Sequence, residues 1–190
     1  MRLPFQALAA VALSTLATLG PLPARAGEPA GDEAGHALEA RDLPADAPRF
    51  DSYPAQMQRT PRARLRLGKA DLGYRTRLRR LAREPVNFAG RYILGLWGCG
   101  TSCLVLRIID TATGRVLPAP GLGSVEFSAV ADSALDAGPV EGPVKFRTDS
   151  RLLVLLGAPE EDSSRFGIHY YAVEGERLRL LRHVAAKHAP

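Results

Sequence analysis

The fold is decided by residues 87–117, which read NFAGRYILGLWGCGTSCLVLRIIDTATGRVL. Residues 90–97 and 103–109 are rich in aliphatic and aromatic side chains, as strands are. The stretch DTATG at 110–114 places an aspartate where a turn begins and a glycine where a left-handed residue is needed. The pattern predicts a β-hairpin, followed after this turn by a third strand at 114–117.

Working outward, four more short apolar runs are separated by turn residues, and they predict strands at 144–147, 152–157, 166–173 and 177–184. The irregular piece at 118–143 is long for a plain connection, so it is either a functional loop or holds an undetected strand at 125–130. The predicted fold is mainly β: an antiparallel meander, as a small barrel or a curled sheet, preceded by one short helix.

The predicted helix covers residues 71–83, where apolar side chains recur at three- and four-residue spacing before Pro85 ends the pattern. This helix lies in a basic segment, residues 61–84. Residues 61–83 include nine basic side chains and a single acidic one, Asp71, which gives this segment a net charge of +8. Such a segment favours electrostatic contact with anionic envelope components. Nucleic acid is not expected as a partner, because the basic side chains are not regularly interleaved with aromatic ones and the protein is expected to be exported.

The first 26 residues have the three parts of a secretory signal peptide: a basic start at Arg2, an uncharged run at 5–19, and small residues at Ala24 and Ala26. We expect cleavage after Ala26, a periplasmic location and no stable membrane insertion afterwards. Residues 27–60 are acidic and poor in large apolar side chains, so they predict a disordered lead-in. Residues 85–190 then form the antiparallel β domain.

The two cysteines, Cys99 and Cys103, are four residues apart between two predicted strands. In an extended strand their Cα atoms would be roughly 13 Å apart, too far for a disulfide, so a bond requires a turn that Gly98 and Gly100 permit. In an oxidising compartment a structural disulfide is the favoured interpretation. The alternatives are a redox-active pair or a thiol nucleophile with a base such as His169.

Alternation along the two strands separates an apolar set, Tyr92, Leu94, Leu96, Leu104, Leu106 and Ile108, from the opposite face, which carries Arg91, Trp97 and Arg107. Arginine and tryptophan are enriched at the energetic centres of interfaces, so these three are the candidate binding residues. Two interpretations of Trp97 stay open: an anchor for a partner, or a ring that packs over the disulfide.

The stretch N-F-A-G-R-Y-I-L-G-L-W-G-C-G-T-S-C, with I-I-D-T-A-T-G-R-V after it, resembles exported proteins of Gram-negative bacteria. The resemblance covers about thirty residues and extends loosely to FRTDSRLL at 146–153. It implies an exported, disulfide-containing β domain and implies no reaction.

The sequence contains no phosphate loop, nucleophile elbow, metal-ligand set or acid–base pair that could be recognised, so no catalytic residue, metal or cofactor is predicted. We therefore expect a non-catalytic periplasmic binding protein: an inhibitor, an immunity-type partner or an envelope accessory factor, with a protein or envelope ligand. The competing class is an enzyme, either a thiol oxidoreductase using Cys99 and Cys103 or a hydrolase whose residues meet only in the fold.

Overall fold

A computed structural model describes residues 44–127 and 142–186, all of which belong to one compact unit, Ala34–Pro190. The predicted signal peptide, with its cleavage site at Ala26, lies outside the described residues. Within the described ranges no helix is long and apolar enough to cross a membrane.

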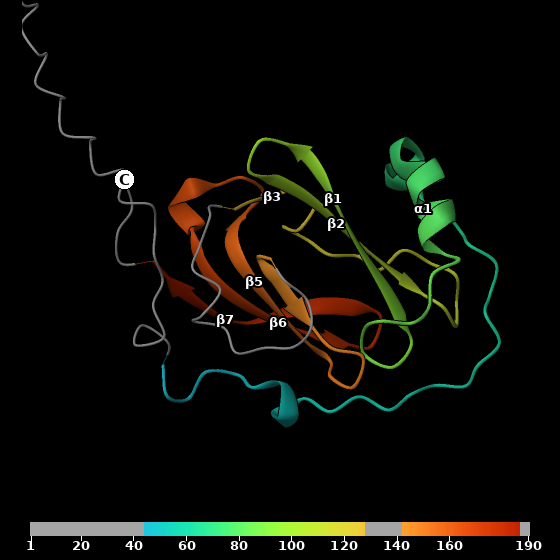
Figure 1. Cartoon of the computed structure of the whole chain (residues 1–190), viewed down its shortest axis with the longest axis horizontal. Coiled ribbons are helices and arrows are strands. Elements are labelled where there is room, and N and C mark those ends of the chain that lie inside the picture. Colours follow the sequence, from blue (N-terminus) through green and yellow to red (C-terminus); the bar gives the residue numbers. More distant parts are fainter. Residues whose placement is uncertain (1–43, 128–141, 187–190) are drawn as a thin grey trace, which may run out of the picture. The chain divides into compact units, whose positions relative to one another are not determined.

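The described chain is dominated by one antiparallel sheet of seven strands (Figure 1). Its strands are β1 (Tyr92–Gly100), β2 (Cys103–Asp110), β3 (Val125–Glu126), β4 (Val144–Phe146), β5 (Leu152–Pro159), β6 (Gly167–Glu174) and β7 (Arg177–Ala185). The strand order is β1-β2-β3-β5-β6-β7, and β4 pairs with β5 beside β3. The mainly-β, antiparallel prediction is confirmed. Of the two predicted forms, the small barrel is wrong, because β1 and β7 lie at opposite ends of the strand order and do not pair with each other.

Two strand predictions need correction. Residues 114–117 form no strand: they touch their neighbours through two isolated bridges, Ile109 to Val116 and Arg66 to Arg115. Pro118, which has no N–H to donate, follows at once and stops the pairing from extending. The undetected strand expected at 125–130 is present as the two residues of β3, while residues 128–130 lie outside the described part.

The main core lies between the β1–β2 hairpin and the β5–β6 part of the sheet. Leu94, Leu106 and Ile108 of the hairpin are buried against Leu153 and Leu155 of β5. This is the apolar face that alternation predicted. Because a shift of one residue would turn the whole set outward, the burial of these side chains fixes the register of the hairpin.

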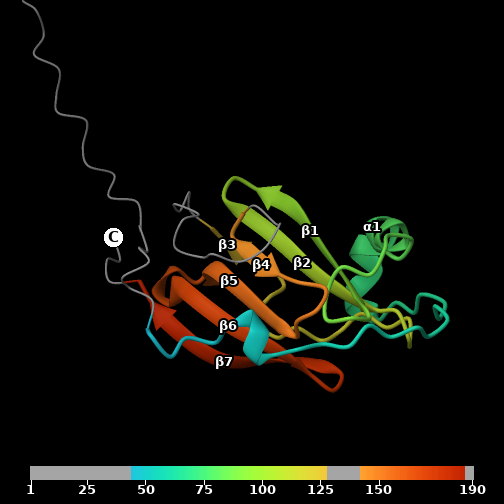
Figure 2. The same cartoon turned by 60° about the horizontal axis from the view of Figure 1, so that its bottom comes forward.

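The opposite face of β5 and β6 is covered by the segment that precedes the hairpin. Phe50, in the short 3₁₀ helix η2 (Phe50–Ser52), is buried against Leu152, Val154 and Ile168. Figure 2 shows this segment, in cyan, crossing the outer strands. The sequence predicts a disordered lead-in as far as residue 60, but the described residues 44–60 follow the sheet, because Phe50, with Ala47 and Tyr53 beside it, packs on this face.

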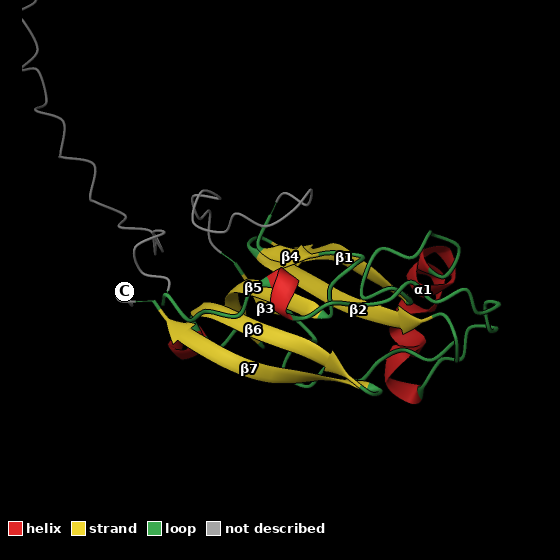
Figure 3. Cartoon of the chain, turned by 90° about the horizontal axis from the view of Figure 1, so that it is seen from below, coloured by secondary structure: helices red, strands yellow, loops and turns green. Residues whose placement is uncertain are grey.

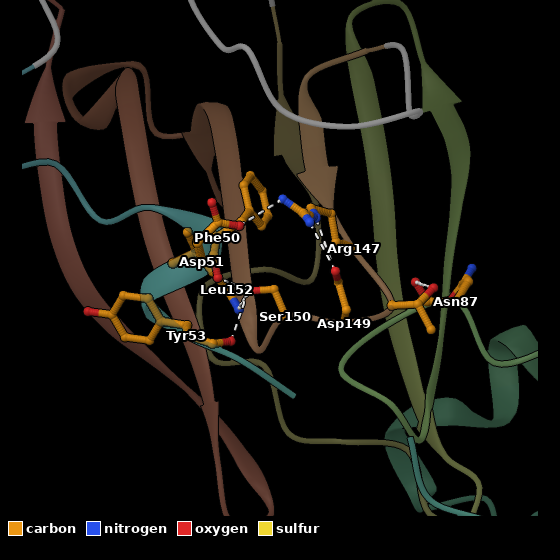
Figure 4. Close-up of polar contacts among 9 residues, drawn as sticks. Phe50, Asp51, Tyr53, Asn87, Arg147, Asp149, Ser150 and Leu152 are labelled. Carbon is orange, nitrogen blue, oxygen red and sulfur yellow. Dashed lines mark hydrogen bonds and ion pairs between the residues drawn. The ribbon is translucent and has the colours of Figure 1, made fainter. Parts of the chain in front are cut away.

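A polar cluster fastens this segment at the turn before β5 (Figure 4). The buried hydroxyl of Ser150 lies 2.8 Å from the carbonyl oxygen of Phe50 and 2.9 Å from that of Tyr53, and donates its proton to one of them at a time. Arg147 binds Asp149 through two hydrogen bonds of 2.9 and 3.0 Å and reaches Asp51 at 3.2 Å. The hydrogen bonds from Arg147 lower the pKa of the Asp149 carboxyl below its usual value.

The predicted helix is confirmed as a 3₁₀ helix, η3 (Lys69–Tyr74), that continues into α1 (Arg75–Leu81). Asp71, in the first turn, caps the amino end of this helix, since its carboxylate accepts a hydrogen bond from the Gly68 N–H at 3.0 Å. Leu78 is fully buried, and its face of the helix packs on the outer face of the hairpin. Figure 3 shows α1, in red, beside the end of β2, while strands form most of the rest.

His169 is a buried imidazole on β6. Its Nε2 atom lies 2.8 Å from the carbonyl oxygen of Arg165, and its ring stacks on His183 with centroids 4.2 Å apart. Burial lowers the pKa of His169 to about 4, because the charged ring would lose its hydration and would also face His183 and Arg165.

This lowered pKa predicts acid sensitivity. An unfolded histidine takes up its proton near pH 6.5, whereas folded His169 does so only near pH 4, so stability is lost as the pH falls between these values. Urea unfolding should show a lower free energy of unfolding at pH 4.5 than at pH 7.5. In His169→Leu this difference between the two pH values should be smaller, by about 3 kcal/mol at most. An unchanged pH dependence in His169→Leu would contradict the buried, neutral imidazole.

Candidate functional site

The most unusual group of side chains surrounds Trp97, which is half-buried on β1. The ring of Tyr74 lies 5.7 Å from that of Trp97, centroid to centroid. The guanidinium carbon of Arg77 lies 5.6 Å from the centre of the Trp97 ring, and that of Arg107 lies 4.5 Å from the centre of the Tyr74 ring. Each arginine is within cation–π range of its ring. We call these four residues the aromatic–arginine cluster.

Both the helix and the hairpin position this cluster. Tyr74 and Arg77 are three residues apart and so lie on one helical face. The helix can approach the hairpin closely because Gly95 has no side chain: a Cβ atom there would lie 2.6 Å from Leu81 Cδ2. On β2, Nη1 of Arg107 donates to the carbonyls of Leu106 at 2.7 Å and Gly123 at 3.1 Å. These bonds hold its guanidinium over Tyr74.

The tip of the hairpin is closed by a disulfide between Cys99 and Cys103, whose Cα atoms are 5.2 Å apart. Cys99 is exposed and Cys103 is buried. Between them, Ser102 adopts a left-handed conformation with φ of 53°, which the tight turn requires. The bond restrains the strand that carries Trp97 two residues before the first cysteine.

Two surface grooves meet at the contact between Arg77 and Trp97. One lies towards the disulfide and is lined by Tyr74, Gly98 and Cys99 together with that pair. The other runs between α1 and β1, where Arg80 and Leu81 form the helical side. Leu96 forms its strand side and Glu84 its end. Arg77 and Trp97 therefore line both grooves and divide them.

Of the three candidate binding residues, the structure brings two together. Trp97 and Arg107 both contact Tyr74. Arg91 lies at the other end of the hairpin, about 20 Å along the strand from Trp97 at the usual rise per residue. There it forms an ion pair of 2.5 Å with the buried carboxylate of Asp110. That contact orders the turn after β2.

Sequence reasoning missed Tyr74 and Arg77. Their three-residue spacing in the predicted helix was a usable signal, but nothing local indicated that their face of the helix would meet Trp97. The second interpretation of Trp97, packing over the disulfide, also needs modification: its ring contacts Tyr74 and Arg77, and Cys99 lines the groove beside it. The indole N–H is covered and has no hydrogen-bond partner among the described residues.

The groups that a thiol hydrolase would need are not assembled. Both cysteines are in the disulfide, and the ring of His169 contacts Arg165, Tyr171 and His183. Among residues 44–127 and 142–186, no cluster of three or more His, Cys, Asp or Glu side chains is placed to hold a metal ion. The chemistry that the aromatic–arginine cluster offers is recognition: flat apolar rings beside fixed positive charges.

Comparison with known proteins adds no further guide, since no family, no curated protein and no solved structure matches this chain.

The disulfide generates a stability prediction. It closes a ring of five residues, and removing it with Cys99→Ser and Cys103→Ser together should lower the free energy of unfolding by roughly 2 kcal/mol. In the native oxidised protein neither sulfur should react with iodoacetamide until a reductant is added. Rapid alkylation without reductant would contradict a structural bond and would favour thiol chemistry.

Proposed function

We propose that this chain is a non-catalytic periplasmic binding protein, an inhibitor, immunity-type partner or envelope accessory factor, that holds a protein partner at the aromatic–arginine cluster. The observation that carries the proposal is the position of Trp97. The ring is half-buried between Tyr74 and Arg77, with a groove on each side of that contact.

Physical arguments support this use of the surface. Tryptophan, tyrosine and arginine are the residue types that dominate binding energy at protein interfaces. Here they are held by a helix on one side and a disulfide-closed hairpin on the other, so little conformational entropy would be lost on binding. The two grooves are open surface features that side chains of a partner could enter.

The periplasmic location rests on the sequence and on the disulfide. A leader with the features of a signal peptide precedes the domain, and a structural disulfide is expected where the compartment is oxidising. The basic segment at 61–83 would then also face anionic envelope components. Two of its arginines, Arg77 and Arg80, line the grooves at the cluster, so attraction to an anionic surface and partner recognition would use neighbouring groups.

The test is a pull-down from periplasmic extract with the exported chain as bait, followed by reconstitution with the purified partner. The wild type and Arg79→Ser should retain a stoichiometric partner, whereas Arg77→Ser should weaken binding about tenfold or more. Arg79 is the matched control, because it lies exposed on the same helix and lines neither groove.

The competing class makes the opposite prediction in the same preparation. If no partner is retained and the wild type reduces insulin while Cys99→Ser does not, the protein is a thiol oxidoreductase and the proposal fails.

A further inference from the structure

The outer edge of β1 is covered by the chain itself over its first residues. The backbone N–H and C=O of Tyr92 are bound by the backbone of Phe88 at 2.9 and 3.1 Å. The side-chain amide of Asn87 then binds the backbone of Leu94, accepting from its N–H at 2.8 Å and donating to its C=O at 2.9 Å. Asn87 thus takes the place that a neighbouring strand would occupy.

Beyond Leu94 this protection stops. In an antiparallel strand, alternate residues direct their N–H and C=O groups to the same side, so Leu96 and Gly98 point outward as Leu94 does. Their pairing with Leu106 and Leu104 continues the register of Leu94 with Ile108. Within the described parts of the chain, no hydrogen bond is made to the outward backbone groups of Leu96 or Gly98.

The other edge of the sheet is treated differently. β7 carries Arg177, Arg179 and Arg182 along its length, and Arg179 and Arg182 form ion pairs with Glu174 and Asp46. Charged side chains of this kind are how proteins prevent unwanted pairing at an edge strand. The unpaired part of β1 carries Leu96, Trp97 and Gly98 instead. It therefore has the features of an edge left available for pairing.

A groove lies beside this part of β1. One side is α1, with Arg77, Arg80 and Leu81, and the other is β1, with Leu96 and Trp97. A strand edge beside a helix is the arrangement in which proteins take up an extended peptide, whose backbone pairs with the edge while its side chains enter the groove.

The charge of the groove indicates which kind of peptide would bind in it. The groove is lined by two arginines and one acid, Glu84, and residues 69–83, which include its helical wall, carry six basic side chains and one acid, a net charge of +5. A peptide with acidic side chains facing α1 would meet Arg77 and Arg80. A second copy of this chain, paired edge to edge, would bring two such basic surfaces together, and this repulsion disfavours it.

We propose that an extended acidic segment of a partner protein adds to the sheet as a strand beside β1, pairing with the backbone of Leu96 in the groove formed with α1 and with the backbone of Gly98 in the adjoining groove towards the disulfide. The inference rests on the proposed binding function and specifies its mode. Trp97 and Arg77 then act together: the ring supplies apolar contact beside the added strand, and the guanidinium supplies charge.

The test uses a synthetic probe, acetyl-Glu-Val-Glu-Val-Glu-Val-Glu-amide, titrated against the full exported chain. Gly98→Pro removes the outward N–H without touching the β2 pairing, and proline is tolerated on the solvent side of an edge strand. Gly98→Ala is the matched control, because a Cβ atom at this position meets no atom within 4 Å and the N–H remains. We expect Gly98→Pro to weaken binding about tenfold or more and Gly98→Ala to leave it within about twofold.

Two further readouts make the test specific. Hydrogen exchange at the Leu96 and Gly98 amides, followed by NMR, should slow when the probe binds, while the exposed amide of Thr101 should be unaffected. Replacing glutamate by lysine in the probe, or Arg80 by serine in the protein, should weaken binding, and added salt should do the same.

Each outcome decides the matter. Equal binding by Gly98→Pro and Gly98→Ala, or no protection of these amides, would overturn strand addition. If the natural partner from the pull-down still binds Gly98→Pro and loses affinity in Arg77→Ser, the binding function stands and only its mode is wrong. Concentration-dependent dimerisation abolished by Gly98→Pro would instead identify a second copy as the occupant and overturn the acidic peptide.

Discussion

The close approach of Leu81 to Gly95 is the contact on which the candidate site depends. A Cβ atom at position 95 would lie 2.6 Å from Leu81 Cδ2, so any side chain there would have to displace the isobutyl group of Leu81, which packs the helix on the hairpin. From this contact, α1 places Leu78 in the interior and brings Tyr74 and Arg77 over Trp97. The same placement forms the wall of the groove beside β1. The missing side chain at position 95 thus helps to form both the cluster and one wall of the groove.

The hairpin is therefore covered on both faces but left incomplete along one edge. One face is buried against β5, the other lies under the helix, and Asn87 closes the edge as far as Leu94. The disulfide restrains the remaining, more exposed portion. The proposed recognition of a protein partner and the proposed addition of a strand would both use this same portion, where residues are ordered but backbone groups have no partner within the described chain. The buried part of the hairpin, as far as Leu94, thus contributes to stability, and the more exposed part near the disulfide is the one proposed to bind.

Much of the fold could be predicted because its signals are local. Alternation in residues 92–109 predicted the hairpin and its buried face, and the cysteine spacing, with the glycines around it, predicted the disulfide. Contacts between distant segments could not be predicted in this way. Phe50 lies in a stretch whose other residues are mostly polar or small, and its burial depends on a sheet face formed about one hundred residues later.

In the candidate site, too, the residues with local sequence signals could be predicted and those that depend on distant contacts could not. Trp97 and Arg107 followed from alternation, which assigns a face but not a position along the strand, and for that reason Arg91 was grouped with them. Tyr74 and Arg77 required knowledge of how the helix packs. The unpaired backbone of Leu96 and Gly98 is invisible in the sequence, because it depends on where Asn87 ends its pairing.

The central claim, that Gly95 sets the helix and thereby the site, can be measured directly with Trp97, the single tryptophan of the chain. Gly95→Val should displace α1, so Trp97 emission should shift to longer wavelength and acrylamide quenching should increase, while far-UV circular dichroism keeps the signature of the sheet. Gly98→Val on the same strand is the control, since a Cβ atom there meets nothing within 4 Å. Identical emission and quenching in Gly95→Val and the wild type would contradict the account.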